Sequence, residues 1–317
     1  KFQVSSFKNI IGIACDGTGY GWDGKIWGGE VFSIYNPSLE HPALWANRLG
    51  HLEEQTLIGG DLSIAEPARM LISLLSKIYP KNDIFEFVKH YYSKKNFEVI
   101  YSQLSQNFNC QPTTSTGRVL DAISILLGFC ENERKYKHYA AKAMEENSAP
   151  TRKLLAPKIQ NTNSGIKILK TTNLLKYIAS QLHCHSEFIS GSHVDLSLRG
   201  GYCRRGNLEI LKQVQNDTKH QELAALAQTY IINGLYQIAK KSHKPKTNLP
   251  IFLSGGFANN KIFQKFAAKN NIYIPQQLSP GDDNIAAGQI FWYLISTANQ
   301  ELGKTFIYQQ IRGTKLP

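Results

Sequence analysis

The sequence predicts an α/β fold, because short apolar segments with strand character alternate with longer segments of helical periodicity. Two of the strands run directly into glycine-rich turns, where a backbone can approach a ligand closely. The chain has 317 residues, of which 42% are hydrophobic. It is long enough for two ordinary domains or one two-lobed body with a sizeable core, and its composition argues against global disorder.

The N-terminal part predicts a β-hairpin. Residues 10–15 (IIGIAC) form an apolar run typical of a buried strand. Residues 16–24 are rich in glycine and predict a turn, and residues 27–35 (WGGEVFSIY) predict the returning strand. We therefore expect the glycine-rich segment to lie in the turn of the hairpin.

Apolar residues at helical spacing predict most of the remaining elements. Pro67 suits the first turn of a helix over residues 64–79, and residues 115–128 have a Ser/Thr start and a Gly stop. Further helices are expected at residues 83–99, 135–147, 174–182, 222–241, 259–270 and 284–297, and short strands at 250–253 and 272–274. Residues 151–172 are polar and show little periodicity.

Residues 184–219 differ from their surroundings, since they are rich in Ser and Gly, basic and poorly periodic. They resemble the peptide encoded when a mobile palindromic repeat inserts in frame into a bacterial gene. We expect an exposed insertion loop, which costs little loop-closure entropy at the surface. The alternative is a basic nucleic-acid arm around Arg199, Arg204 and Arg205, but only Tyr202 supplies an interleaved aromatic ring.

Charge and cysteine usage limit the classes of partner and compartment. The formal net charge is +12 and the isoelectric point about 9.3, which favours anionic partners. The lysines are scattered, so we expect a solvated surface and no nucleic-acid partner. The sequence contains no run of 18 consecutive apolar residues, so we expect no transmembrane helix. The five cysteines include no C-x-x-C pair. They are odd in number and widely spaced, which fits reduced thiols in a cytoplasm.

The first motif that carries chemistry is DGTGYG at residues 16–21. The backbone N–H groups of Gly17, Gly19 and Gly21 suit phosphate oxygens, and Thr18 adds a hydroxyl donor. Asp16 stands at the end of a buried strand, where it suits a metal ion or its water. The spacing excludes the Walker loop, and the strand that follows excludes a Rossmann turn. A tight β-turn without a ligand is the structural alternative.

Two further motifs lie near the C-terminus. In LSGGFANN (253–260), Gly255 and Gly256 allow backbone contact with a ligand before a helix N-terminus, and Asn260 suits a ribose or base edge. In PGDDNIAAGQ (280–289), Asp282 is a candidate metal ligand. The structural alternatives are a tight turn with Asn260 as a helix cap, and an acidic cap before the second helix.

The order of these three motifs is similar to that in the actin-like ATPases, whose nucleotide lies between two lobes. The longer stretch DGTGYGWDGKIWGGE (16–30) resembles the hallmark of the HypF family, the carbamoyltransferases that mature nickel–iron hydrogenases. The resemblance extends from about residue 10 to 294 and is interrupted at 184–219. It is carried by further stretches: RLGHL (48–52), GGDLSIAEPARM (59–70), TSTGRVLDAISILLG (114–128) and LSGG (253–256).

The resemblance implies an actin-like ATPase fold of two RNase-H-like lobes, the first truncated at its N-terminus, with residues 1–317 as the C-terminal carbamoyl-transfer domain. Family members use ATP and carbamoyl phosphate in upstream domains to form carbamoyl adenylate. They pass the carbamoyl group to the C-terminal cysteine thiol of HypE. By this resemblance Asp16, Gly17, Thr18, Gly19, Tyr20 and Gly21 hold phosphate, Asp121 and Asn260 contact the adenosine, and Asp16 and Asp282 bind a divalent metal.

The sequence also departs from the family pattern. Residues 136–141 (YKHYAA) stand where the family has Tyr-Glu-Gly-x-Ala-Ala, so that Lys137 and His138 replace Glu and Gly. A non-catalytic remnant of a split gene that binds only nucleotide is therefore one alternative. The other is a tRNA threonylcarbamoyl transferase-like enzyme, against which the DGTGYG hairpin argues because that relative uses a different loop.

Overall fold

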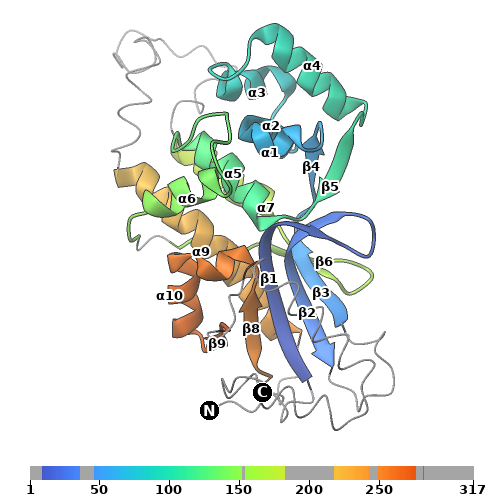
Figure 1. Cartoon of the computed structure of the whole chain (residues 1–317), viewed down its shortest axis with the longest axis vertical. Helices are drawn as coiled ribbons and strands as arrows, with labels where there is room; N and C mark the ends of the chain where they lie inside the picture. The colour runs from blue at the N-terminus through green and yellow to red at the C-terminus, as the bar shows by residue number, and fades with distance from the viewer. Residues whose placement is uncertain are drawn as a thin grey trace, which may run out of the picture.

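The computed structural model describes residues 9–35, 46–151, 154–182, 218–242, 249–275 and Gly281. These residues form a mixed sheet with helices packed around it, which confirms the predicted α/β class (Figure 1). The main path of the sheet has the order β6-β7-β3-β2-β1-β8-β9; β5 joins it through β2, and β4 pairs with β5. The expected helix at 284–297, Asp282 and most of the expected insertion at 184–219 lie outside the described residues.

The N-terminal hairpin exists, but its turn lies later than predicted. Strand β1 (Asn9–Tyr20) runs through the glycine-rich motif and pairs antiparallel with β2 (Ile26–Tyr35). The register shifts between Cys15 and Gly19, so residues 16–18 form a bulge rather than the turn. The actual turn closes between Gly21 and Lys25, where Gly21 N–H donates to the Lys25 carbonyl at 2.9 Å.

Several strands follow the hairpin in sequence. Strand β3 (Ala46–Leu52) continues the antiparallel meander, and β4 (Gln55–Ile58) pairs with β5 (Cys110–Thr113). Strands β6 (Ile159–Asn161) and β7 (Lys167–Leu169) lie in the segment without predicted structure. Strands β8 (Ile251–Ser254) and β9 (Ile272–Tyr273) agree with prediction, and β8 pairs parallel with β1.

Two predicted helices are each divided in two. Helices α1 (Leu62–Ala65) and α2 (Pro67–Leu75) are separated by Glu66, because a residue before proline is driven out of the helical region. Helices α3 (Lys81–Val88) and α4 (Lys94–Ser105) are separated because Ser93 is extended and caps the second helix at Asn96 N–H.

The other helices agree more closely with prediction. They are α5 (Thr116–Leu126), α6 (Tyr139–Glu146), α7 (Thr171–Gln181), α9 (Thr218–Lys241) and α10 (Lys261–Lys269). The short 3₁₀ helix η3 (Gly256–Asn259) lies where a glycine-rich turn is predicted. Residues 218–219 of the expected insertion belong to α9. None of the described helices is both long and apolar enough to cross a membrane.

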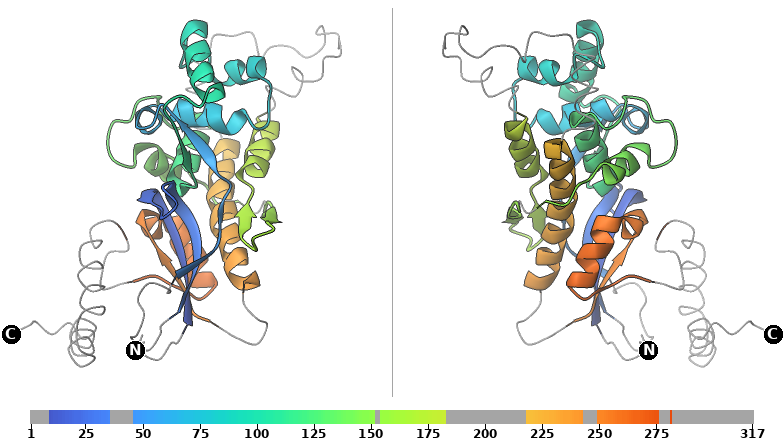
Figure 2. Two further views of the ribbon diagram at one scale, coloured as in Figure 1. Left: turned by 90° about the vertical axis from the view of Figure 1, so that its right-hand side faces the viewer. Right: turned by 90° about the vertical axis from the view of Figure 1, so that its left-hand side faces the viewer.

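The core lies where helices meet the sheet. Helix α9 contacts β1, β2, β3 and β7 and runs beside α10 (Figure 2). Helix α5 contacts β1 and β2 and packs against α2, whose residues are almost all buried. Helix α5 is thus held from both sides, and its N-terminus is fixed next to the bulge of β1.

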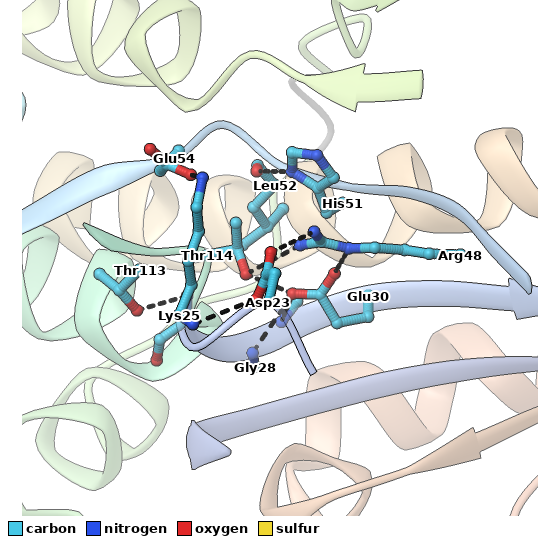
Figure 3. Close-up of polar contacts among 12 residues, drawn as sticks. Asp23, Lys25, Gly28, Glu30, Arg48, His51, Leu52, Glu54, Thr113 and Thr114 are labelled. Carbon is cyan, nitrogen blue, oxygen red and sulfur yellow. Dashed lines mark hydrogen bonds and ion pairs between the residues drawn. The ribbon is translucent and has the colours of Figure 1, made fainter. Parts of the chain in front are cut away.

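A buried ion pair joins β2, β3 and the hairpin turn (Figure 3). Glu30, whose side chain is only 2% exposed, accepts from Arg48 Nε at 2.6 Å and also from the Thr114 hydroxyl. The Arg48 guanidinium is 3.5 Å from the Asp23 carboxylate and stacks 4.1 Å from the Trp27 ring centroid. Every part of both charged groups is therefore engaged, which offsets the cost of burying them.

We predict that Glu30→Gln lowers the free energy of unfolding by about 3 kcal/mol, because Arg48 would remain buried with an uncompensated charge. Urea unfolding of both proteins measures this difference. Glu86→Gln is the matched control, because Glu86 pairs with Lys89 at the surface, with side chains 30% and 42% exposed. Its expected change is within about 0.5 kcal/mol, and similar losses in the two variants would contradict the prediction.

Candidate functional site

The bulge of β1 is the point where three other backbone segments meet. A Cβ at Gly28 would lie 2.5 Å from the Asp16 carbonyl oxygen, and one at Gly117 would lie 2.8 Å from Gly17 Cα. Such distances are below any real carbon contact, so only glycine fits at both positions. The segment Cys15–Gly17 is therefore closely approached by the backbones of β2 and α5.

The turn after β8 approaches the same segment. Gly255 has φ +89°, and a Cβ there would lie 2.2 Å from the Cys15 carbonyl oxygen. A Cβ at the next residue, Gly256, would lie 3.4 Å from Asp16 Oδ1. The structure thus brings together the two glycine-rich motifs that the sequence placed more than 200 residues apart, as the ligand-binding interpretation expects.

The N-terminus of α5 is fixed to the bulge by Ser115. Its hydroxyl lies 3.1 Å from the Asp16 carbonyl oxygen and 2.5 Å from the Gly17 carbonyl oxygen, and it caps α5 by accepting from Arg118 N–H at 3.1 Å. The positive end of the helix dipole therefore points to the bulge. A helix N-terminus and a glycine-rich bulge are both suited to an anionic group.

Asp121 lies behind this surface in a buried ion pair. Its Oδ2 is 2.8 Å from Arg118 Nη2, and the two side chains are 8% and 6% exposed. Burial raises the pKa of the Asp121 carboxyl, while the charges of Arg118, Arg134 and His138 oppose this rise. The carboxylate predicted to contact adenosine is thus already bound to an arginine.

His138 stands at the edge of the site. A Cβ at Gly256 would lie 3.9 Å from His138 Cε1, so this ring is near the second glycine of the β8 turn. His138 precedes α6 and has φ +65°, a conformation that favours glycine. The left-handed backbone explains why glycine suits this position, and the replacement places an imidazole beside the site.

The outer half of the DGTGYG motif has a different position. Gly19 and Tyr20 pair with Trp27 and Ile26 in the ladder, beyond the bulge. The Tyr20 side chain is 89% exposed. Within the motif, the bulge at Asp16, Gly17 and Thr18 is therefore the part that lies closest to the β8 turn.

Asn260 caps a helix, which is the structural alternative to a contact with the ligand. Its Oδ1 accepts from Ile262 N–H at 3.0 Å and Phe263 N–H at 3.1 Å, which caps α10. Its Nδ2 donates to Gln228 Oε1 on α9 at 2.8 Å. Because the side chain is occupied by these bonds and only 5% exposed, this geometry does not favour the direct contact with adenosine.

The described residues alone do not fit a metal ion. They contain no group of three or more His, Cys, Asp or Glu side chains that could hold one. Asp16 accepts from the neighbouring Gly17 N–H at 2.7 Å. Since Asp282 lies outside the described residues, Asp16 is the one predicted ligand that the structure places, and no reaction step is derived through a metal.

The cysteine next to the bulge is fully buried. Burial raises the pKa of the Cys15 thiol far above its ordinary value, with the Glu30 and Asp16 charges adding to this effect. Burial likewise raises the pKa of Cys130 to about 12. Both thiols therefore stay protonated at neutral pH, and the thiolate is the reactive form.

Sequence interpretation missed Ser115 and Arg118. Both lie in the stretch TSTGR, which predicts only the start of a helix and carries part of the family resemblance. The available signal was a cation in the first helical turn, where the dipole disfavours positive charge. A buried arginine at that position needs an anionic partner, and Asp121 of the same helix is one.

Comparison with known proteins identifies similar chains. The family model described as "Carbamoyltransferase, Kae1-like Domain, second subdomain" matches residues 12–195 and 203–289. The probable carbamoyltransferase HypF of Methanocaldococcus jannaschii is 34% identical over 300 residues, which are 91% of this chain and 33% of the relative. Carbamoyltransferase HypF2 of Cupriavidus necator is 33% identical over 310 residues, covering 93% of this chain and 35% of the relative.

Solved structures of HypF proteins are also similar to this chain. The HypF of T. kodakarensis has a TM-score of 0.65 and 25% identity, over 94% of this chain and 36% of that one. Full-length HypF in its phosphate- and nucleotide-bound form has a TM-score of 0.66 and 20% identity, over 97% of this chain and 34% of that one. These matches bear out the actin-like fold, and the chain spans about a third of the length of these relatives.

We predict that Gly255→Ala destabilises the protein by at least about 2 kcal/mol more than Gly24→Ala. Both glycines have positive φ, but only Gly255 also lies against another backbone, whereas nothing lies within 4 Å of a Cβ at Gly24. Denaturant unfolding of the two variants separates backbone strain from the steric clash. Equal losses would show that the β8 turn is not held against Cys15.

Proposed function

This chain belongs to the Kae1-like domain family of the carbamoyltransferases, and from this premise we propose that it carries out the transfer step of hydrogenase maturation. The carbamoyl group passes from carbamoyl adenylate to the C-terminal cysteine thiol of a HypE-like protein. Carbamoyl adenylate is made from ATP and carbamoyl phosphate in the part of the relatives that lies outside the match. The reaction takes place in the cytoplasm.

The observation that carries this proposal is the convergence of the β1 bulge, the β8 turn and the N-terminus of α5 on one backbone segment. The bulge and the β8 turn are rich in glycine, and the third segment is the first turn of a helix, a combination that suits the phosphate of an adenylate. A fixed array of donors stabilises the phosphate as it leaves the carbamoyl carbon. The related full-length HypF was solved with phosphate and nucleotide bound, which supports the same use here.

The thiols of Cys15 and Cys110, which lie in the described part of the chain, support an external acceptor. Cys15 is fully buried, and burial raises the pKa of its thiol. Burial also raises the pKa of Cys110, which lies on β5. Because the thiolate is the nucleophile, a thiol on an extended C-terminal segment of a partner reaches the carbamoyl carbon more readily than these do.

The site residues are proposed in two groups. We assign the phosphate to the bulge residues Asp16, Gly17 and Thr18 and to Gly255 and Gly256, with the outer residues Gly19, Tyr20 and Gly21 completing the hairpin. Asn260 has a positioning role, since it caps α10, and Asp121 lies behind the surface. A divalent metal held by Asp16 and Asp282 remains part of the proposal.

We predict carbamoyl transfer when the 317-residue chain is combined with carbamoyl adenylate and a HypE-like protein that ends in cysteine. Intact-mass spectrometry is expected to show one added carbamoyl group on the partner. The control is the same partner with its terminal cysteine replaced by alanine, which should stay unmodified. Equilibrium dialysis with metal, on wild type and Asp16→Asn, tests the metal assignment separately.

Two other outcomes distinguish the alternatives. Transfer to tRNA with none to the thiol would contradict this proposal in favour of a threonylcarbamoyl transferase-like enzyme. Nucleotide binding without transfer to either acceptor, even with the upstream part of a relative supplied, would indicate a non-catalytic remnant. The non-catalytic alternative is supported by two replacements at the edge of the site, where Lys137 and His138 stand in place of the family's Glu and Gly.

A further inference from the structure

Arg118 is a buried cation whose hydrogen-bonding capacity is only partly used. The residue is 5% exposed, and its Nη2 pairs with Asp121 at 2.8 Å. Its Nε and Nη1 are buried and have no hydrogen-bond partner within the described part of the chain. Buried donors without a partner are rare, and for a charged group they are especially costly.

The other strongly buried arginine of this region gives a direct comparison. Arg48 engages each of its three nitrogens: Nε with Glu30, Nη1 with Asp23 and Nη2 with the Thr114 hydroxyl. Its plane also stacks on Trp27. Arg48 therefore has a structural role. Arg118 is buried to a similar extent, but two of its nitrogens have no hydrogen-bond partner among the described residues.

The position of Arg118 brings its guanidinium to the edge of the site. A Cβ at Gly17 would lie 3.5 Å from Arg118 Nη2, so the guanidinium borders the bulge on the side where glycine leaves space. Arg118 is the third residue of α5 after the Ser115 cap. A cation there is disfavoured by the helix dipole unless an anion lies nearby.

We propose that Arg118 binds an oxyanion of the nucleotide phosphate that lies over the β1 bulge. The guanidinium has enough donors to bind the phosphate while it keeps its ion pair with Asp121, because Nε and Nη1 have no other partner among the described residues. A planar guanidinium suits this task, because its fixed donors match phosphate oxygens two at a time. The inference rests on the proposed function only in placing a nucleotide at the bulge.

This arrangement assigns a different part to Asp121. The carboxylate holds the guanidinium in place and balances its charge while the site is empty of anion. Asp121 is therefore a positioning residue for Arg118 rather than the adenosine contact that the resemblance implies. The contribution of Arg118 to affinity should therefore depend on the phosphate of the ligand and little on its neutral nucleoside part.

Calorimetric titration of the 317-residue chain with ATP, and separately with adenosine, tests the inference. We expect Arg118→Lys to weaken ATP binding at least about tenfold, because lysine keeps the charge but loses the fork. Adenosine binding should be unchanged. Arg48→Lys is the matched control: it should lower the melting temperature and leave the ratio of the two affinities as in wild type.

Each result has a defined meaning. An equal loss for ATP and adenosine, or an unchanged ATP affinity in folded Arg118→Lys, would overturn the inference while the proposed function stands. Failure of the wild-type chain to bind ATP would overturn the nucleotide site, and this inference with it.

A measurement on wild type alone remains decisive if the variant does not fold. Buried ion pairs are screened much less by salt than surface lysines are. The preference for ATP over adenosine should therefore persist between about 0.05 and 0.5 M salt. Loss of the preference over that range would assign the phosphate contact to the surface and contradict the role of Arg118.

Discussion

The close approach of three backbones to Cys15–Gly17 is the constraint on which the site depends. Gly28, Gly117 and Gly255 each lie so near this segment that a methyl group would overlap with it. These contacts fix β2, α5 and β8 relative to β1 without any specific side chain. The Ser115 hydroxyl and the Glu30–Arg48 ion pair then hold two of these partners in place.

Much of the fold was predictable, because strand and helix periods are local properties of sequence. The failures have separate physical causes. Strand β1 continues through a glycine-rich motif because a bulge absorbs its irregularity while the ladder with β2 resumes at Gly19. Strands β6 and β7 are only three residues long, so neither presents enough alternation to be recognised. Glu66 and Ser93 interrupt helical patterns through backbone conformation, which hydrophobic spacing does not record.

The candidate site was predictable in part. The sequence singles out Gly17, Gly255 and Gly256 because glycine before or after a strand is visible in a single sequence, and the structure brings these residues close together. Their convergence depends on the parallel pairing of β1 with β8, which a local pattern does not specify. Asn260 proved to be a cap because the same side-chain type serves both purposes, and only its bonds to α10 and Gln228 separate them.

The number of extra residues in the β1 bulge also has a consequence for the strand. Cys15 pairs with Gly29 and Gly19 pairs with Trp27, so three residues of β1 stand opposite one residue of β2. The excess is two residues, an even number, and side chains on both halves of β1 therefore keep the same alternation between inside and outside. Deletion of one residue would turn the exposed face that carries Tyr20 toward the interior. Deletion of two would restore a plain hairpin, so the strand could keep its parity while the bulge disappeared.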